Sequence, residues 1–343
     1  MKPVFAALLA FLFLGGCGSS DQQTYLPGRV GPVGEMVVVL PQKYWDSAIV
    51  DAIRSVTDRP YELLPQAESA VDVALLDPSE FDRFWKPHRN VLVVDLADRI
   101  DTQEPSLKVY RDKYASDQIY AEVKGKTADE VAEVIRNQGE QLVRAIQAAE
   151  LKRVAELVRT NINEALRAEV AENWKLQIDF PKDARKVTEN ENFLWVQREI
   201  TRMKGGNNHD IKQGFFVYTY PYESDSVFSF QWQIKKRNDM LYRYVHGQPE
   251  GSFMTTEMEL IPSYEEVNFD GRFTSEIRGL WKMENDFMGG PFVMMTFFDE
   301  ANQRIVTLEG YAYAPYFNKR EYIREAEAIL KTAKITDAQP KAG

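Results

Sequence analysis

The densest group of residues able to bind a small anion lies between positions 276 and 292. It consists of residues 276–281 (EIRGLW) and residues 286–292, which begin at Asp286 and read DFMGGPF. In one interpretation, the planar guanidinium of Arg278 clamps a carboxylate or phosphate, and Trp281 and the turn after Asp286 form the rim of a ligand site. In the alternative, which we favour, residues 288–291 form a tight hairpin turn that fixes the register, and Trp281 packs on the core.

Carboxylates are the second group able to do chemistry. Hydrolysis of a sugar polymer needs two carboxyl groups about 5 to 9.5 Å apart in a cleft. The candidates in the C-terminal half are Glu257, Glu276, Asp286 and Glu309. A pair among them predicts, as an alternative function, a hydrolase that acts on an envelope polymer.

Two clusters of charged residues are further candidates for binding. Residues 235–239 (KKRND) include Arg237 and Asp239, although their spacing favours the solvated face of a helix in which Asp239 pairs with a lysine one turn away. Lys319 and Arg320 open the last predicted helix, where positive charge opposes the helix dipole. We therefore expect Lys319 or Arg320 to contact a partner elsewhere.

The single cysteine, Cys17, ends a sequence that resembles a bacterial lipoprotein signal peptide. Lys2 provides a positive start, residues 4–14 are apolar, and residues 14–17 (LGGC) match the lipobox. The apolar run of about 11 residues is too short to cross a bilayer core of roughly 30 Å, so it indicates a cleaved signal. We predict that Cys17 is acylated and that two or more acyl chains anchor the mature chain, facing the periplasm from the outer membrane. The alternative is an ordinary secretory signal with an incidental cysteine.

Several classes of function are excluded by composition. With Cys17 acylated no thiol remains for disulfides, thiolate metal sites or cysteine nucleophiles. The three histidines are isolated in sequence, and no G-x-S-x-G, S-x-x-K or Walker motif occurs. A formal charge of −10 over 343 residues lacks the basic surface that nucleic-acid binding requires. We therefore predict no metal, no cofactor and no nucleic-acid partner.

Composition and hydrophobic pattern divide the chain into six segments. They are a lipoprotein signal peptide and lipobox (1–17), a flexible tether (18–34), an N-terminal α/β domain (35–125), a long helical connector (126–173), a C-terminal α+β domain (174–335) and a disordered tail (336–343).

The predicted N-terminal domain alternates strand and helix signals. A helical pattern covers residues 44–56, and the pair Asp77-Pro78 is typical of the start of a second helix. Short apolar runs predict strands at 36–40, 71–76, 90–96 and 118–123. This alternation indicates an α/β layer.

From Thr127 the apolar residues follow helical spacing. Thr127 and Glu130 form a capping box, and the pattern continues to about residue 172, which as one helix would be near 65 Å long. Gly139 is a candidate position for a break or bend. One interpretation is a rigid arm or an oligomerisation surface. We favour the alternative, two consecutive helices that cover sheet faces and join the two halves.

The second half is rich in strand signals. Residues 319–333 show helical spacing. Residues 226–245 are ambiguous, because aromatic and apolar residues at 228–234 alternate as in a strand while 234, 241 and 245 follow helical spacing; we predict a helix there. Strands are predicted at 175–180, 193–200, 214–220, 252–260, 273–283, 291–298 and 305–313. We expect a mainly antiparallel sheet with helices, and thus an α+β class for this half.

These segments resemble a family of Bacteroidota lipoproteins of unassigned function, the domain-of-unknown-function family 4837. Residues 278–281 (RGLW) and 286–292 (DFMGGPF) are its most distinctive part. Phe253 stands where that family usually has Tyr. The resemblance also rests on segments spread over nearly the whole chain: the lipobox and residues 26–27, 34–35, 89–92, 193–195, 251–257, 309–310, 314–315 and 319–320. The resemblance implies an envelope location and one shared architecture, and it supplies no catalytic residues.

The leading functional hypothesis is therefore a non-catalytic envelope lipoprotein. It is held at the membrane by its N-terminal acyl chains and binds an envelope protein or a small ligand that the sequence does not identify. The hydrolase is the second hypothesis. A component of an assembly that uses the long helix is the third.

Overall fold

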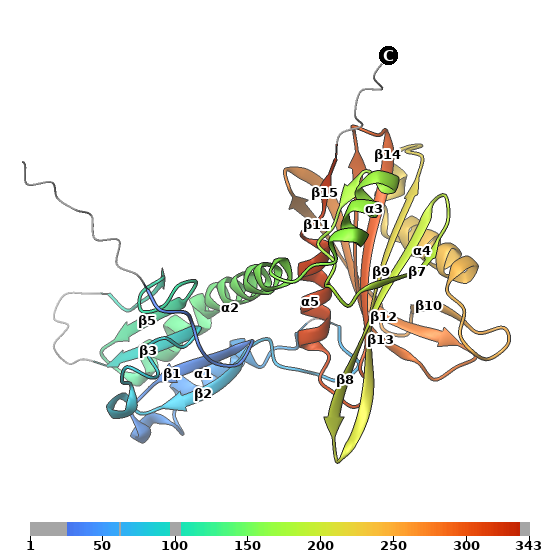
Figure 1. Cartoon of the computed structure of the whole chain (residues 1–343). Helices are drawn as coiled ribbons and strands as arrows, with labels where there is room; N and C mark the ends of the chain where they lie inside the picture. The colour runs from blue at the N-terminus through green and yellow to red at the C-terminus, as the bar shows by residue number, and fades with distance from the viewer. Residues whose placement is uncertain (1–25, 62, 97–103, 337–343) are drawn as a thin grey trace, which may run out of the picture.

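The computed structural model describes residues 26–61, 63–96 and 104–336, so Cys17, most of the predicted tether and residues 337–343 lie outside the described part of the chain. The described chain forms two large sheets with helices, joined by one long helix, and a small two-stranded sheet (Figure 1). Within these residues, no helix is both long and apolar enough to cross a membrane.

The N-terminal sheet is mainly parallel. Its order is β2-β1-β3-β5-β4, and only the edge strand β4 is antiparallel to its neighbour. The strands are β1 (Glu35–Val39), β2 (Asp72–Leu76), β3 (Asn90–Leu96), β4 (Ser106–Arg111) and β5 (Ile119–Gly125). The near-continuous apolar run of β1 fits a strand that is buried on both faces.

Helices α1 (Ala48–Thr57) and α2 (Ala128–Arg159) cover one face of this sheet. Phe81 and Tyr114, from irregular segments, pack on the other face. Ser47 caps α1, because its hydroxyl accepts from the amide of Ile49. The helix expected after Asp77 is only one 3-10 turn, η2 (Pro78–Glu80), and the predicted helix from 44 begins with another, η1 (Gln42–Tyr44).

The long helical pattern is two consecutive helices, as favoured above. α2 contains 32 residues, which at 1.5 Å per residue is about 48 Å. It ends at Arg159, and α3 (Glu164–Trp174) begins after a new cap, where the side chain of Asn163 accepts from the amide of Leu166. Gly139 lies inside α2 and does not break it, because its bare Cα packs against Val56 of α1.

The C-terminal sheet is antiparallel and curled (Figure 1). Its order is β10-β12-β13-β14-β9-β8-β7, with β11 also paired to β12. The strands are β7 (Arg185–Glu189), β8 (Phe193–Lys204), β9 (Asn207–Tyr220), β10 (Phe253–Glu257), β11 (Ser263–Phe269), β12 (Arg272–Glu284), β13 (Gly289–Asp299) and β14 (Arg304–Tyr313).

The two faces of this sheet carry separate cores. On one face, α5 (Arg320–Leu330) packs with α3, and nearby β6 (Leu176–Gln177) pairs with β15 (Lys334–Ile335). On the other face lie the 3-10 turn η3 (Asp225–Phe228) and α4 (Phe230–Tyr244), whose aromatic contacts include Phe193 and Tyr244, 4.7 Å apart. The mixed class predicted from the sequence, α/β followed by α+β, is therefore confirmed.

Four strands had no counterpart in the sequence prediction: β4, β7, β11 and β15. They are short or lie at sheet edges, and their residues alternate charged and apolar types without a buried run. An edge strand owes its conformation to one neighbour, so its own sequence carries a weak signal.

Residues 26–34, predicted as the end of the tether, lie against the N-terminal sheet. Gly28 and Val30 form bridges with Ser116 and His88, and the amide of Val30 donates to the carbonyl of Pro87 at 3.0 Å.

Candidate functional site

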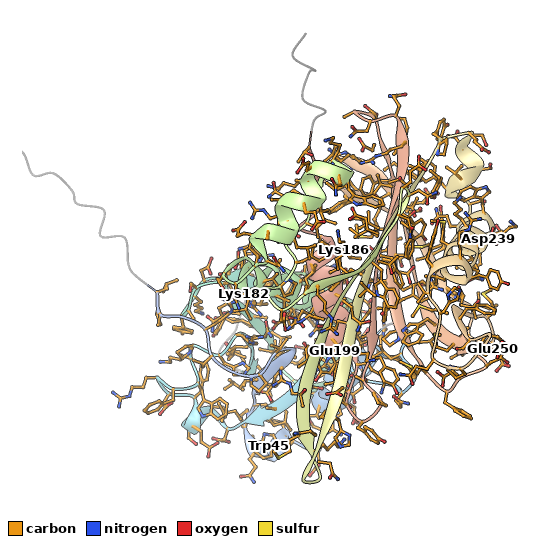
Figure 2. The ribbon with its side chains drawn as sticks, turned by 45° about the vertical axis from the view of Figure 1, so that its right-hand side comes forward. Trp45, Lys182, Lys186, Glu199, Asp239 and Glu250 are labelled. Carbon is orange, nitrogen blue, oxygen red and sulfur yellow. The ribbon has the colours of Figure 1, made fainter. Side chains whose placement is uncertain are left out.

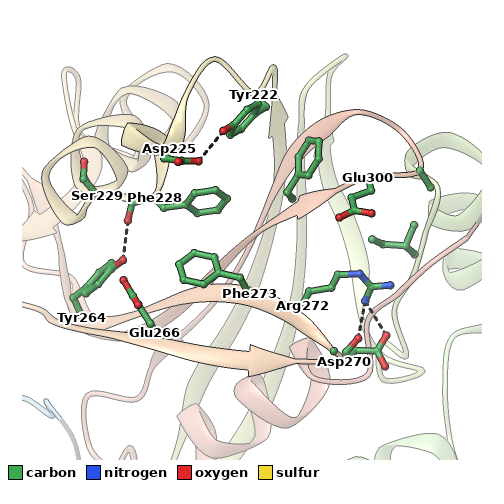
Figure 3. A pocket seen from close by; sticks show the side chains of 14 residues that line it. Tyr222, Asp225, Phe228, Ser229, Tyr264, Glu266, Asp270, Arg272, Phe273 and Glu300 are labelled. Carbon is green, nitrogen blue, oxygen red and sulfur yellow. Dashed lines mark hydrogen bonds and ion pairs between the residues drawn. The ribbon is translucent and has the colours of Figure 1, made fainter.

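A large open groove lies at one end of the C-terminal sheet. It has a volume of about 1390 Å³ and lies between η3, the hairpin that joins β11 to β12, and the turn between β13 and β14 (Figure 3). The hairpin turns at Asp270-Gly271, where both residues have positive φ (53° and 81°), as a two-residue type I′ turn requires.

Aromatic side chains form the apolar part of the groove. Phe228 and Phe273 meet edge to face with ring centroids 5.2 Å apart, and Tyr222 lies at the same distance from Phe298. Phe273 remains 49% exposed and Tyr222 43% exposed, although large apolar side chains usually pack away from water. The Tyr264 hydroxyl donates to the carbonyl of Phe228 at 3.0 Å and so ties β11 to η3.

Carboxylates form the polar part of the groove. The lining contains four carboxylates, Asp225, Glu266, Asp270 and Glu300, and a single cationic side chain, Arg272. Arg272 pairs with Asp270 at 2.8 Å, and Asp225 accepts from the Tyr222 hydroxyl at 2.7 Å. Among the described residues, neither Glu266 nor Glu300 forms an ion pair, so the groove carries uncompensated negative charge.

Arg278 does not reach this groove. Its guanidinium pairs with both oxygens of Glu327 on α5, at 2.8 and 2.9 Å, and with Glu276 on its own strand at 2.6 Å. Burial alone would raise the pKa of Glu327, but Arg278 and Lys331 together hold it at about 2. The predicted anion clamp is therefore occupied by the protein's own carboxylates.

Trp281 is buried, as the favoured interpretation proposed. Its indole Nε1 donates to the carbonyl of Ala312 at 3.3 Å, and its ring meets Tyr311 edge to face. Arg278 and Trp281 lie three residues apart on one strand and so point to opposite faces of the sheet. They do not form a common site.

The predicted position of the tight turn, residues 288–291, is wrong by about three residues. Gly289 and Gly290 are the first residues of β13, and the chain reverses over residues 285–288, with positive φ at Asn285. The glycines are needed for close approach, because a Cβ on Gly290 would lie 2.0 Å from the carbonyl oxygen of Ala312. Asp286 lies in this turn and accepts from the amide of Phe287.

Arg237 lies in the interior and not on a solvated face. Its guanidinium donates to both oxygens of Glu309 and to the hydroxyl of Thr256 at 2.8 Å, and it stacks 3.8 Å from the Phe292 ring. Burial raises the pKa of the Glu309 carboxyl, and the positive charge of Arg237 opposes that rise. Asp239, in contrast, lies on the outer surface of α4 (Figure 2) and pairs with Lys235 at 3.0 Å, as predicted.

The four carboxylates considered for hydrolysis do not converge. Glu309 on β14 pairs with Met294 on β13, which in turn pairs with Ile277 on β12, and Glu309 faces α4. Glu276 directly precedes Ile277 on β12, so its side chain points to the opposite face of the sheet, toward α5. Glu257 is opposite Leu280, which is four residues along β12 from Glu276, or about 13 Å. Its carboxylate is paired with Lys282 at 3.2 Å. Glu257, Glu276 and Glu309 therefore do not meet in one cleft, and Asp286 lies beyond the end of β12, in the turn before β13.

Lys319 and Arg320 do find partners elsewhere, as the helix-dipole argument predicted. The carboxylate of Glu68 accepts from the backbone amides of Lys319 and Arg320, at 2.6 and 3.0 Å, and so caps α5 from the other half of the chain. The Arg320 guanidinium pairs with Asp72 of β2 at 2.6 Å. These residues therefore join the two halves and do not line the groove.

The groove residues were missed by the sequence prediction. Asp270-Gly271 between alternating residues is a strong hairpin signal, and it would have placed Phe273 beside the turn. Tyr222 and Phe228 lie in a polar, Ser- and Asp-containing stretch, where aromatic residues have no local reason to be buried. Their proximity to Phe273 depends on the sheet order.

The described residues offer no cluster of three or more His, Asp or Glu side chains arranged to hold a metal ion. The His88 ring nitrogens contact the Glu35 carboxylate and the carbonyl of Asn90, each at 3.0 Å.

Comparison with known families covers nearly all of the described chain. Residues 163–332 match the family described as Domain of unknown function (DUF4837). The C-terminal half of the chain belongs to this family. The DUF4837 match contains the whole C-terminal sheet and every groove-lining residue except Ile335. It does not contain residues 1–162, where the other segments that carry the resemblance lie. A separate family, also described as Domain of unknown function (DUF8532), matches residues 29–159. No curated protein matches the sequence.

Proposed function

We propose that this protein is a lipid-anchored envelope protein that binds a partner without chemical conversion, and that the groove is its binding site. The observation that carries the proposal is the groove itself, in which exposed aromatic rings and unpaired carboxylates line one open space. Exposed apolar side chains that are gathered in one contiguous patch, and not scattered singly, are typical of binding surfaces.

The arrangement of the charged residues supports binding over catalysis. The carboxylates and arginines singled out from the sequence are engaged with one another, as in the Arg237–Glu309 and Arg278–Glu327 pairs.

The anchor in this proposal is Cys17. The carbonyl of Pro27 accepts from the amide of Ser116, so at most nine residues, 18–26, lie between Cys17 and the folded body. Nine residues reach at most about 30 Å. Under this proposal the short segment after Cys17 keeps the folded body close to the outer-membrane surface, on the periplasmic side.

The anchor is tested by Cys17→Ser. Cells fed an alkyne-labelled fatty acid should label the wild-type chain and not the variant, and detergent phase partition should move the variant from the detergent to the aqueous phase. Equal labelling of the two chains, or their equal partition, would show that the cysteine is incidental.

The groove is tested with a random peptide library displayed on phage and selected on the full-length chain in detergent. The clones are then screened against Ala301→Trp, which places a bulky ring on an exposed residue of the lining, and against Phe273→Ala. Phe287→Ala, which removes an exposed ring at the far end of β12, is the matched control. We expect peptides that bind wild type and Phe287→Ala but lose at least tenfold in affinity for the two groove variants. A selection that yields no groove-dependent peptide contradicts the proposed function.

A further inference from the structure

We propose that the partner bound in the groove is a basic protein segment in extended conformation, whose lysine or arginine side chains meet the groove carboxylates. This inference rests on the proposed function and adds the chemistry of the partner. Three independent features of the groove lead to it: its charge, its aromatic lining and the free edge of β11.

The charge of the groove selects a cation. Four carboxylates line it against one arginine, and that arginine is already paired with Asp270. Glu266 and Glu300 are exposed, and neither forms an ion pair with a lysine or arginine in the part of the chain that the structure describes. An anionic partner would meet like charge, whereas a cationic one would be attracted and oriented.

The aromatic lining suits the same cation. The exposed rings of Phe273 and Tyr222 offer faces on which an ammonium or guanidinium group is attracted, and against which the apolar stem of lysine or arginine packs. Asp225, next to Tyr222, supplies a carboxylate at that end of the groove. Aromatic rings and carboxylates side by side match long basic side chains better than purely apolar ones.

The size and border of the groove favour a protein segment over a small molecule. Its volume of about 1390 Å³ exceeds the roughly 300–1,000 Å³ of typical small-molecule pockets. Strand β11 borders it through Tyr264 and Glu266, and β11 pairs with β12 alone among the described strands. A sheet edge of this kind can pair with an added strand, which presents alternate side chains to one side, as Tyr264 and Glu266 do.

The test uses two fluorescein-labelled heptapeptides of matched length, Lys-Val-Lys-Val-Lys-Val-Lys and Glu-Val-Glu-Val-Glu-Val-Glu, with fluorescence anisotropy on the full-length chain in detergent. We expect saturable binding of the lysine peptide, at least about tenfold tighter than that of the glutamate peptide. The binding should weaken when salt is raised from 50 to 300 mM, because exposed charges are screened.

The carboxylates are tested with the double variant Glu266→Gln/Glu300→Gln. The substitutions keep the shape and exposure of the side chains, so the variant should fold as the wild type does. Its affinity for the lysine peptide should be about fivefold lower or more. The matched control is Glu250→Gln/Glu284→Gln, which removes two exposed carboxylates outside the groove and should change nothing. Equal binding of the two peptides, or unchanged binding by the groove variant, overturns the inference.

The two proposals fail in different ways. If the phage library yields groove-dependent peptides while the lysine heptapeptide does not bind, the groove remains a binding site and only the basic partner is wrong. If the library yields none, the proposed function is wrong and this inference falls with it.

Discussion

Arg237 and Glu309, 72 residues apart in the sequence, form a buried bidentate ion pair. The Nε and Nη2 groups of Arg237 donate to the two carboxylate oxygens of Glu309 at 3.0 and 2.6 Å, and both side chains are fully buried. The pair joins α4 to β14 and so fixes the helix on its face of the sheet.

Removing one partner of this pair should be costly. We expect Arg237→Met to lower the free energy of unfolding by about 3–5 kcal/mol, because it leaves the Glu309 carboxylate buried without a counter-charge. The double variant Arg237→Met/Glu309→Leu should recover part of that loss. Urea denaturation measures both. The control is Lys235→Met, whose exposed pair with Asp239 contributes under about 1 kcal/mol. Similar values for the two single variants would contradict this account.

The Glu68 cap on α5 is predicted to hold the two halves together. Glu68→Ala leaves the amides of Lys319 and Arg320 without their acceptor and should cost about 1–2 kcal/mol, the range of other capping residues. Hydrogen exchange should accelerate at the first turn of α5, with Glu80→Ala, an exposed residue of η2, as the control. Unchanged exchange at residues 319–323 would mean that the cap contributes nothing.

Acid should weaken the fold through Glu327. Its pKa is about 2 in the folded protein against an ordinary 4.5, so the folded state favours the ionised form. The resulting stabilisation, roughly 3 kcal/mol, is complete above about pH 4.5 and is lost as the pH falls toward 2. In Glu327→Gln the free energy of unfolding should vary less over this range than in wild type. Glu133→Gln, on the exposed face of α2, should keep the wild-type slope; an equal slope in Glu327→Gln would refute the role of this carboxyl.

Gly290 is predicted to tolerate no side chain. Gly290→Ala forces a Cβ to 2.0 Å from the carbonyl oxygen of Ala312 and must displace β13 from β14, at a cost of about 1–3 kcal/mol or more. Calorimetry should show a melting temperature lower by several degrees. Gly28→Ala, where nothing lies within 4 Å of the added atom, should melt as wild type. A wild-type melting temperature for Gly290→Ala would show that the strands yield without strain.

Local patterns predicted most of the elements. The apolar runs at β1, β3, β13 and β14 and the helical spacing of α2 are properties of neighbouring residues, because burial of one face imposes its period on the sequence. The helix assigned to 226–245, despite its alternating aromatic residues, is confirmed as η3 and α4. The edge strand β11 was missed, since its residues alternate in exposure without a buried face.

Local sequence pattern does not predict which charged residues pair with each other. Lys319 and Arg320 were suspected because two cations conflict with a helix start, a local rule. Arg237 was expected to be solvated because its neighbours in sequence are charged, and only the packing of α4 over β14 turned it inward. Glu276 and Arg278, in contrast, share one face of β12 because residues i and i+2 of a strand always do, and their side chains pair there.

The sequence by itself determined the mixed fold class and the positions of the main buried strands and helices, because each depends on residues close together in the chain; acylation at Cys17 is a prediction from the same local pattern. The tertiary structure decided which charges are neutralised inside and which remain open. The groove between Tyr222, Phe273 and Glu300 exists only because strand order brings η3, the β11–β12 hairpin and the β13–β14 turn to one end of the sheet. Segments separated by dozens of residues meet there through long-range strand pairing, and no local period records that pairing.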